Sequence, residues 1–340
     1  MELTWRSWSL NQYCLSKIWF RTHSVDLRVM DLNSITSSVK SWLYADQTFK
    51  PEEMIIFRPP SYGGLGVHSV KWKAMAGLIR SFLETACNEK FQTSLFHSQL
   101  YRYHILDDRT IPNPGFPPFF KIIKKVHKDS PLNVAHMSEK QWYAVLIEDN
   151  VTMESTNGEQ RQYIPSRIEL KNPETNWEHS WRLARLKGLG SENVSFLFRL
   201  LHCTLPTQER LSKTNANHSP LCKFPGCTGS DEEDTLHALV TCSGNNGTGY
   251  AIMNGVKRLL PGLKEDEALR LDLDIEEHLE LPVVFTLSVA WGALWDLRLN
   301  RTRPELYLIR AQLEAKVAIL RNCRNFFNSA QIIDTIIDTL

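Results

Sequence analysis

The feature that most constrains this chain is a group of three cysteines and one histidine between residues 222 and 242. The spacing is Cys222-x4-Cys227-x9-His237-x4-Cys242. Thiolates and imidazoles are ligands for zinc, and four of them within so short a segment can converge on one tetrahedral ion. Four protein ligands leave no position for a water molecule. The sequence therefore predicts one structural Zn²⁺ and not a hydrolytic centre.

The residues between these ligands support a knuckle-like arrangement. Lys223-Phe-Pro-Gly226 predicts a tight turn between the first two cysteines, and Ser230-Asp-Glu-Glu-Asp234 predicts the capped, acidic first turn of a helix that carries His237. The other interpretation is a set of unrelated core cysteines and a surface histidine. If one ligand is misassigned, the nearby substitutes are His202, Cys203 and His218.

The other cysteines are scattered. The chain has seven, an odd number, and those outside the group lie at positions 14, 87, 203 and 323, which argues against a disulfide framework. Glu2 and Arg6 interrupt any apolar leader, and no run of about 18 apolar residues occurs. We expect a reducing intracellular location, nuclear or cytoplasmic, and no membrane partner.

Hydrophobic periodicity predicts a mainly α-helical protein. With 42% hydrophobic and 23% charged residues, the chain can bury a substantial core. Three- and four-residue apolar spacings predict helices within 10–45 and over 70–83, 137–148, 177–201, 285–299 and 305–327. Ser138, with Gln141 three residues on, predicts a capping box. Ile55-Ile56-Phe57, between prolines, predicts a short strand.

Proline clusters and composition shifts suggest four segments. These are a helical segment (1–110), a connector with a basic and aromatic helix (111–175), a zinc-binding domain (176–250) and a C-terminal helical region (251–340).

Charge gives no global indication of a partner. Lys and Arg number 39 and Asp and Glu 38, a formal charge of +1, so any nucleic-acid surface must be a local patch. The candidate residues are Lys121, Lys124, Lys125, Lys128, Arg182 and Arg185. Beside the lysines, Phe119 and Phe120 could stack on bases, which suits weak, sequence-tolerant binding of RNA or single-stranded DNA. The other interpretation is the solvated face of an amphipathic helix.

Catalytic motifs are not recognisable. Gly63-Gly-Leu-Gly66 is followed by no Gly-Lys-Ser/Thr, so a structural turn is expected. Tyr44-Ala-Asp-Gln47 resembles a polymerase carboxylate turn, but Gln47 replaces the second acid, and two-metal chemistry needs several convergent carboxylates. We therefore assign no catalytic residue and expect a protein that is not an enzyme.

Several short motifs accompany the Cys-Cys-His-Cys group. They are Lys17–Arg21, Val39–Trp42, Tyr62–Val67, Trp177 with Trp181, Phe196–His202 and Leu205–Thr207. In this order they resemble the C-terminal part of LINE-type (non-long-terminal-repeat) retrotransposon reverse transcriptases. The first three resemble the thumb that follows the palm, and the others the lead-in to the reverse transcriptase zinc-binding domain.

The resemblance implies a helical thumb-like unit followed by a helical unit stapled by a Cys-Cys-His-Cys zinc knuckle. The family's catalytic palm and endonuclease would lie before Met1. The resemblance thus implies a zinc-containing, nucleic-acid-binding fragment without polymerase activity. The competing hypothesis is a zinc-stapled structural or protein-interaction module that does not bind nucleic acid.

Overall fold

The computed structural model describes most of the chain. The residues described are 3–18, 29–44, 53–86, 123, 136–147, 153–156, 160–163, 167–323 and 326–340. Within them the protein is mainly helical, as predicted, and the sheet is one antiparallel pair of short strands, β1 (Met153–Thr156) and β2 (Gln160–Tyr163). Lys121, Lys124, Lys125 and Lys128 lie outside these ranges.

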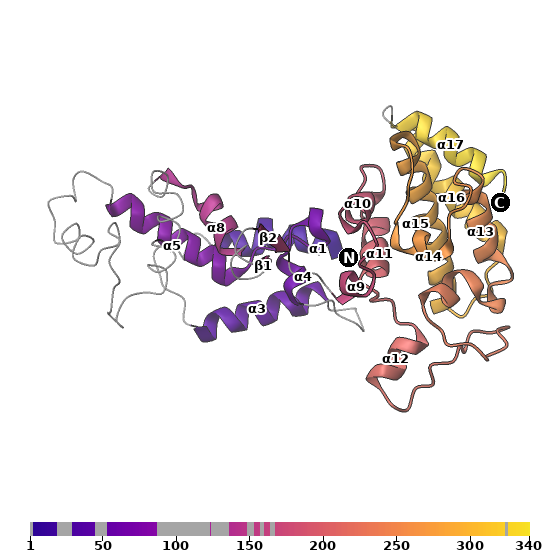
Figure 1. Cartoon of the computed structure of the whole chain (residues 1–340), viewed down its shortest axis with the longest axis horizontal. Coiled ribbons are helices and arrows are strands. Elements are labelled where there is room, and N and C mark those ends of the chain that lie inside the picture. Colours follow the sequence, from indigo (N-terminus) through magenta and orange to yellow (C-terminus); the bar gives the residue numbers. More distant parts are fainter. Residues whose placement is uncertain are drawn as a thin grey trace.

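The N-terminal helices form an elongated group at one end of the molecule (Figure 1). They are α1 (Leu3–Ser9), the π-helical η1 (Leu10–Leu15), α3 (Val29–Leu43), α4 (Glu53–Phe57), the 3-10 turn η2 (Pro60–Tyr62), α5 (Val70–Ala86) and α8 (Glu139–Ile147). A small core fills this group, and Leu43, Ile55 and Val67 are among its fully buried members. Helix α11, introduced below, adds Phe198 to the same core.

The capping box predicted at α8 is present. The Ser138 amide donates to Gln141 Oε1 at 2.7 Å, and the Gln141 amide donates to Ser138 Oγ at 3.3 Å. Two amides that the first helical turn would leave unpaired are thus satisfied reciprocally.

The strand predicted at residues 55–57 is wrong, because this segment belongs to helix α4. A three-residue apolar run fits a buried helical turn as well as a strand, so periodicity cannot separate the two. The carbonyls of Ile55 and Ile56 accept from the amides of Leu65 and Val67, at 2.9 and 3.0 Å. The short helix is therefore held by the turn that follows it.

The second half of the chain forms a larger helical unit. Its helices are α9 (Arg167–Lys171), α10 (Trp177–Leu183), α11 (Gly190–Leu201), α12 (Gln208–Thr214), the π-helical η6 (His237–Thr241), the 3-10 turn η7 (Ser243–Asn245), α13 (Thr248–Lys257), α14 (Glu265–Arg270), α15 (Glu277–Leu299), α16 (Leu306–Arg321) and α17 (Phe327–Ile337). One continuous core extends from Trp181 to Ile337. The boundary predicted at residue 250 therefore does not separate two cores.

Helix α15 is the centre of this unit. It begins at Glu277, not near 285 as predicted, and continues through Pro282. From Pro282 to Trp295 it is buried on nearly every side instead of being amphipathic, whereas both of its ends are exposed. By length and composition it could cross a membrane, but 83% of its most apolar window is buried inside the protein. That degree of burial is what a core helix shows.

The single helix predicted over 305–327 is two helices, α16 and α17. The amides of Cys323 and Phe326 each donate to a carbonyl three residues earlier, both at 2.9 Å. Helix α16 thus ends at Arg321, and α17 begins at Phe327.

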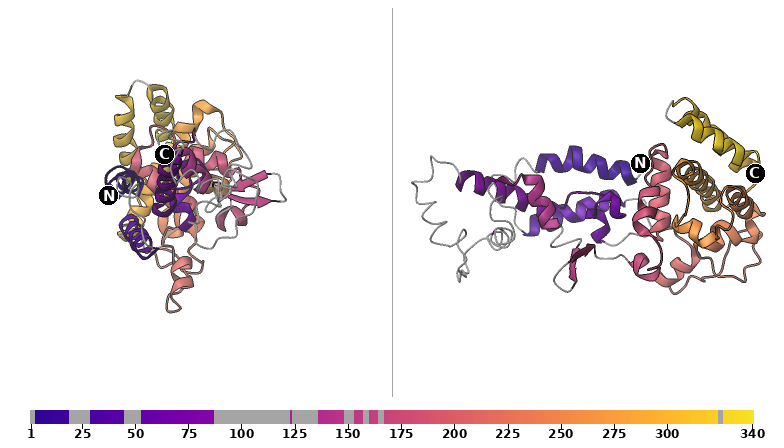
Figure 2. Two further views of the ribbon diagram at one scale, coloured as in Figure 1. Left: turned by 90° about the vertical axis from the view of Figure 1, so that its left-hand side faces the viewer. Right: turned by 45° about the horizontal axis from the view of Figure 1, so that its top comes forward.

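The two helical groups meet at the turn of residues 60–66. His202 Nε2 lies 2.8 Å from the carbonyl oxygen of Gly63, and the guanidinium of Arg185 donates to the carbonyl of Gly64. The Trp181 ring stacks on His202 with centroids 4.7 Å apart. Figure 2 shows α10 and α11 between the N-terminal group and the remaining C-terminal helices.

Candidate metal centre

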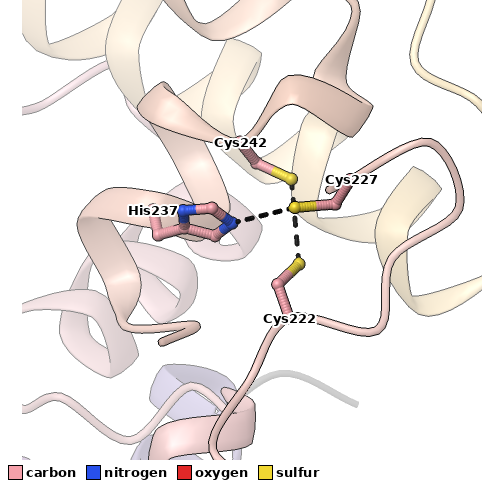
Figure 3. A group of neighbouring side chains, drawn as sticks. All are labelled: Cys222, Cys227, His237 and Cys242. Atoms are coloured by element: carbon pink, nitrogen blue, oxygen red, sulfur yellow. Dashed lines mark hydrogen bonds between the residues drawn. The ribbon is translucent and has the colours of Figure 1, made fainter. Parts of the chain in front are cut away.

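Cys222, Cys227, His237 and Cys242 come together as the sequence predicted. Their side chains point toward one another (Figure 3), and one ligand atom from each lies within 4.8 Å of all the others. Cys222 and Cys242 are buried, Cys227 is partly exposed, and His237 is buried. The group could hold a metal ion.

Two distances test how well the group fits a tetrahedral ion. The sulfur atoms of Cys222 and Cys242 are 3.8 Å apart, and Cys227 Sγ is 3.5 Å from His237 Nε2. With Zn–S of about 2.3 Å and Zn–N of about 2.05 Å, a regular tetrahedron has edges of about 3.8 Å and about 3.6 Å. A disulfide would require about 2.05 Å between the sulfurs. These two distances match the edges of the tetrahedron and exclude a disulfide between Cys222 and Cys242, and the other ligand atoms lie within 4.8 Å of one another.

A short pairing of two chain segments positions Cys222. The Cys222 amide donates to the Asp231 carbonyl at 3.0 Å, and the Glu233 amide donates to the Pro220 carbonyl at 2.9 Å. Leu221 and Glu232 form an isolated antiparallel bridge between these bonds. The first ligand is thus fixed to the segment that leads into His237.

The predicted turn between the first two ligands is present. The Cys227 amide donates to the Phe224 carbonyl at 3.1 Å, and Gly226 has a φ of 83°, which glycine adopts at little cost. Gly244 lies against this turn so closely that a Cβ there would be 2.7 Å from the Pro225 carbonyl oxygen. The backbone following Cys242 is thereby brought beside Cys227.

Helix η6 carries His237, but its cap differs from the prediction. Asp234 Oδ1 accepts from the His237 amide at 2.7 Å, so Asp234, and not Ser230, caps the helical turn that leads into η6. His237 Nε2 faces Cys227, while Nδ1 lies 3.9 Å from an Asp231 carboxylate oxygen. Nε2 is thus the nitrogen that faces the cysteines (Figure 3), and at 3.9 Å the Asp231 carboxylate is too far away to hydrogen-bond Nδ1.

The surrounding protein shifts the pKa values of the two cysteines that flank the turn in opposite directions. Burial raises the pKa of the Cys222 thiol, against hydrogen bonds from the Phe224 amide and Arg298. Burial also opposes ionisation of Cys227, but hydrogen bonds from the Gly229 amide, Ser243 and His237 outweigh it and lower its pKa to about 6. Each donating amide lies two residues beyond its cysteine, so the turn supplies the same N–H···S contact twice.

A buried arginine that sequence reasoning did not connect with the cysteines lies behind them. Arg298 Nη2 is 3.6 Å from Cys222 Sγ and 2.9 Å from Glu233 Oε2, and Nη1 donates to Asn245 Oδ1 at 2.9 Å. In the sequence Arg298 lies near the C-terminal end of the helix predicted over 285–299. Its one local signal was position, since a cation within a long apolar segment must find a partner.

The three substitute ligands do not belong to the group. His202 bonds Gly63 at the junction of the two helical groups, where burial is the main cause that lowers its pKa to about 4. Cys203 and His218 are also outside the set of converging ligand atoms.

Arg182 and Arg185, predicted as nucleic-acid contacts, both have partners within the protein. Arg182 binds both carboxylate oxygens of Glu280, and Arg185 donates to the Gly64 carbonyl. Burial lowers the pKa of Arg185 to about 10. Arg185 is therefore part of the junction and not an open phosphate contact, whereas Arg182 remains half exposed.

Comparison with known proteins adds no identification. No protein-family model and no curated protein matches this chain.

Proposed function

We propose that this chain is a structural-zinc protein in which Cys222, Cys227, His237 and Cys242 hold one Zn²⁺. The observation that carries the proposal is the agreement of the 3.8 Å sulfur–sulfur and 3.5 Å sulfur–nitrogen distances with the edges of a zinc tetrahedron. Three thiolates and one imidazole are soft ligands of the kind that select zinc over magnesium or calcium.

The task of the ion in this proposal is to hold a loop onto the helical core. Segment 220–234 has few apolar residues of its own. Besides the predicted ligands, Phe224 is its one buried apolar residue. Zinc would join this segment to η6, whose Ala238, Leu239 and Val240 are fully buried in the large core. Four protein ligands leave no coordination position for a substrate, so we propose no turnover at this centre.

The partner we propose is RNA or single-stranded DNA, bound weakly and without sequence preference. Support comes from the sequence: the resemblance to the C-terminal part of LINE-type reverse transcriptases, and the clustered Lys121, Lys124, Lys125 and Lys128 in a nearly neutral chain. Arg185 is no longer included, because its guanidinium is committed to Gly64.

Fluorescence anisotropy with a labelled oligonucleotide tests this partner. Four contacts to a single strand imply a slope of log affinity against log salt of roughly −3, about −0.7 for each contact. We expect binding at low salt that fades above physiological salt and is lost in a Lys121/Lys124/Lys125→Glu variant. A matched control is Lys264→Glu, since Lys264 is an exposed lysine on the C-terminal unit.

The second candidate is a protein-interaction module in which zinc serves the fold alone. The observation that favours it is that Arg182 and Arg185 are both bound within the protein. No binding by either protein at low salt would select this candidate, whereas equal binding by the wild type and the triple-lysine variant would place the nucleic-acid contact away from these lysines.

A further inference from the structure

The side chain of Arg298 enters the metal centre from helix α15. This side chain is 4% exposed, and its guanidinium contacts three separate parts of the metal-binding segment. Nη2 reaches Cys222 Sγ at 3.6 Å and Glu233 Oε2 at 2.9 Å, and Nη1 reaches Asn245 Oδ1 at 2.9 Å. The guanidinium carbon also lies 4.3 Å from the centre of the Phe224 ring.

The neighbours of Arg298 are themselves fixed. Asn245 is fully buried and donates through Nδ2 to the Ala238 carbonyl in η6 at 2.9 Å. The backbone of Glu233 is paired with Pro220, next to the first ligand. The guanidinium thus bridges the segments that carry Cys222, His237 and Cys242, and it does so from a helix that contributes no ligand.

The positive charge of Arg298 complements the charge that a zinc-bound site would carry. Three thiolates and one Zn²⁺ carry one net negative charge, and a buried charge is stable only when it is paired and hydrogen-bonded. Arg298 already pairs with Glu233, but its fork of five donors can serve a carboxylate and a sulfur at once. Lysine, with a point charge, could not make all three of these contacts together.

We propose that Arg298 is the counter-charge of the metal centre and a positioning residue for Cys222. It neutralises the charge that the bound site carries, and it ties metal binding to helix α15. The inference rests on the zinc-binding proposal and adds to it a residue far away in sequence, 76 positions from Cys222.

The inference predicts different effects on zinc affinity for substitutions of Arg298 and of its partner Glu233. Arg298→Gln removes the positive charge, and zinc affinity should fall about 10- to 100-fold, the usual effect of losing a group that supports a metal ligand. Glu233→Gln removes a negative charge from the same pair but leaves the arginine beside the sulfur. Zinc affinity should then be unchanged or higher. If Arg298 only completed a structural ion pair, both variants would weaken the site alike.

The experiment is competition for zinc with a chromophoric chelator, using the full chain and four proteins. These are the wild type, Arg298→Gln, Glu233→Gln, and the control Arg303→Gln, which removes an exposed arginine that contacts Asn246 instead of a cysteine. Equal affinity of Arg298→Gln and the wild type would overturn the inference and leave the zinc proposal standing. No zinc binding by the wild type would overturn both.

A measurement on the unchanged protein covers the case in which Arg298→Gln does not fold. In ¹¹³Cd-substituted wild type, protons hydrogen-bonded to a ligand sulfur show scalar coupling to the metal. The amides of Phe224 and Gly229 serve as internal positive controls, because they donate to Cys222 and Cys227. Coupling to the Arg298 guanidinium protons supports the inference. Coupling to the two amides without coupling to Arg298 would overturn it.

Discussion

His202 donates a 2.8 Å hydrogen bond from Nε2 to the carbonyl oxygen of Gly63, which joins residues 139 positions apart. A carbonyl oxygen can only accept, so the imidazole must carry its proton on Nε2. His202 is also stacked against Trp181, with ring centroids 4.7 Å apart. The contact closes the junction between the two helical groups with a neutral, buried histidine.

The first prediction concerns the pH dependence of stability. The folded-state pKa of His202 is lowered, mainly by burial, to about 4, against about 6.5 in an unfolded chain. Between these values the unfolded state binds a proton that the folded state does not, so stability falls as pH decreases. From pH 7 to pH 4 we expect His202 to account for a loss of about 3 kcal/mol.

Chemical denaturation at pH 7 and pH 5 should detect about 2 kcal/mol of this loss, because the folded-state pKa of about 4 lies below pH 5. The comparison is with His202→Gln, which can still donate to Gly63 but does not titrate. Acid release of a metal would affect both proteins equally, so the difference between them isolates His202. The same pH dependence in both proteins would contradict the assignment.

The second prediction concerns the close approach of Gly63 to Trp181. A Cβ at Gly63 would lie 2.5 Å from the indole ring, at a backbone φ of 75°. Gly63→Ala should therefore lower the free energy of unfolding by about 1–2 kcal/mol for the left-handed backbone and by a further 1–3 kcal/mol or so for overpacking. Thermal or chemical denaturation measures the sum of the two contributions.

Gly190 provides the matched control. Its φ is 66°, and nothing lies within 4 Å of the position a Cβ would take. Gly190→Ala should lose only the backbone part. If Gly63→Ala and Gly190→Ala are equally destabilised, Trp181 does not pack against the turn as described.

For local reasons, the sequence was sufficient to predict the helical fold and the convergence of Cys222, Cys227, His237 and Cys242. The four ligands fall within one short segment, and the Ser138–Gln141 capping box involves residues three apart. The contact of Arg298 with the cysteines was missed because it joins residues that are far apart in the sequence. Arg298 reaches Cys222 across 76 residues, and no periodicity or spacing connects the two.

Two further errors also have physical causes. Helix α15 continues through Pro282, a residue that usually ends a helix, so its start at Glu277 was misplaced. Arg185 was predicted to contact phosphate because arginine is a common phosphate ligand. Its guanidinium instead binds the Gly64 carbonyl, which comes from the other helical group.

The third prediction concerns how far from the metal centre the loss of one ligand lowers protection from hydrogen exchange. Cys222→Ser should release the metal and expose the amides of Cys222 and Cys227 to fast hydrogen exchange, since metal binding and local folding are coupled. Ala238 and Val240 should stay protected because they are buried in the large core. Hydrogen exchange followed by mass spectrometry distinguishes these segments.

Cys323→Ser is the control for this experiment. Cys323 is exposed and lies outside the ligand group, so its replacement should alter neither metal content nor exchange near residue 222. Loss of protection throughout helices α13 to α17 in Cys222→Ser would show that the metal supports the whole unit and not one loop.

The metal content of the purified protein tests the central claim most directly. Elemental analysis of folded wild-type chain, prepared without chelator, should give close to one zinc per chain, and Cys242→Ser should give far less. The thiolates and the imidazole already stand at the spacings of a zinc tetrahedron, so the folded chain should acquire the ion during expression. Folded wild-type protein that contains no zinc and takes up none when it is supplied would contradict the account.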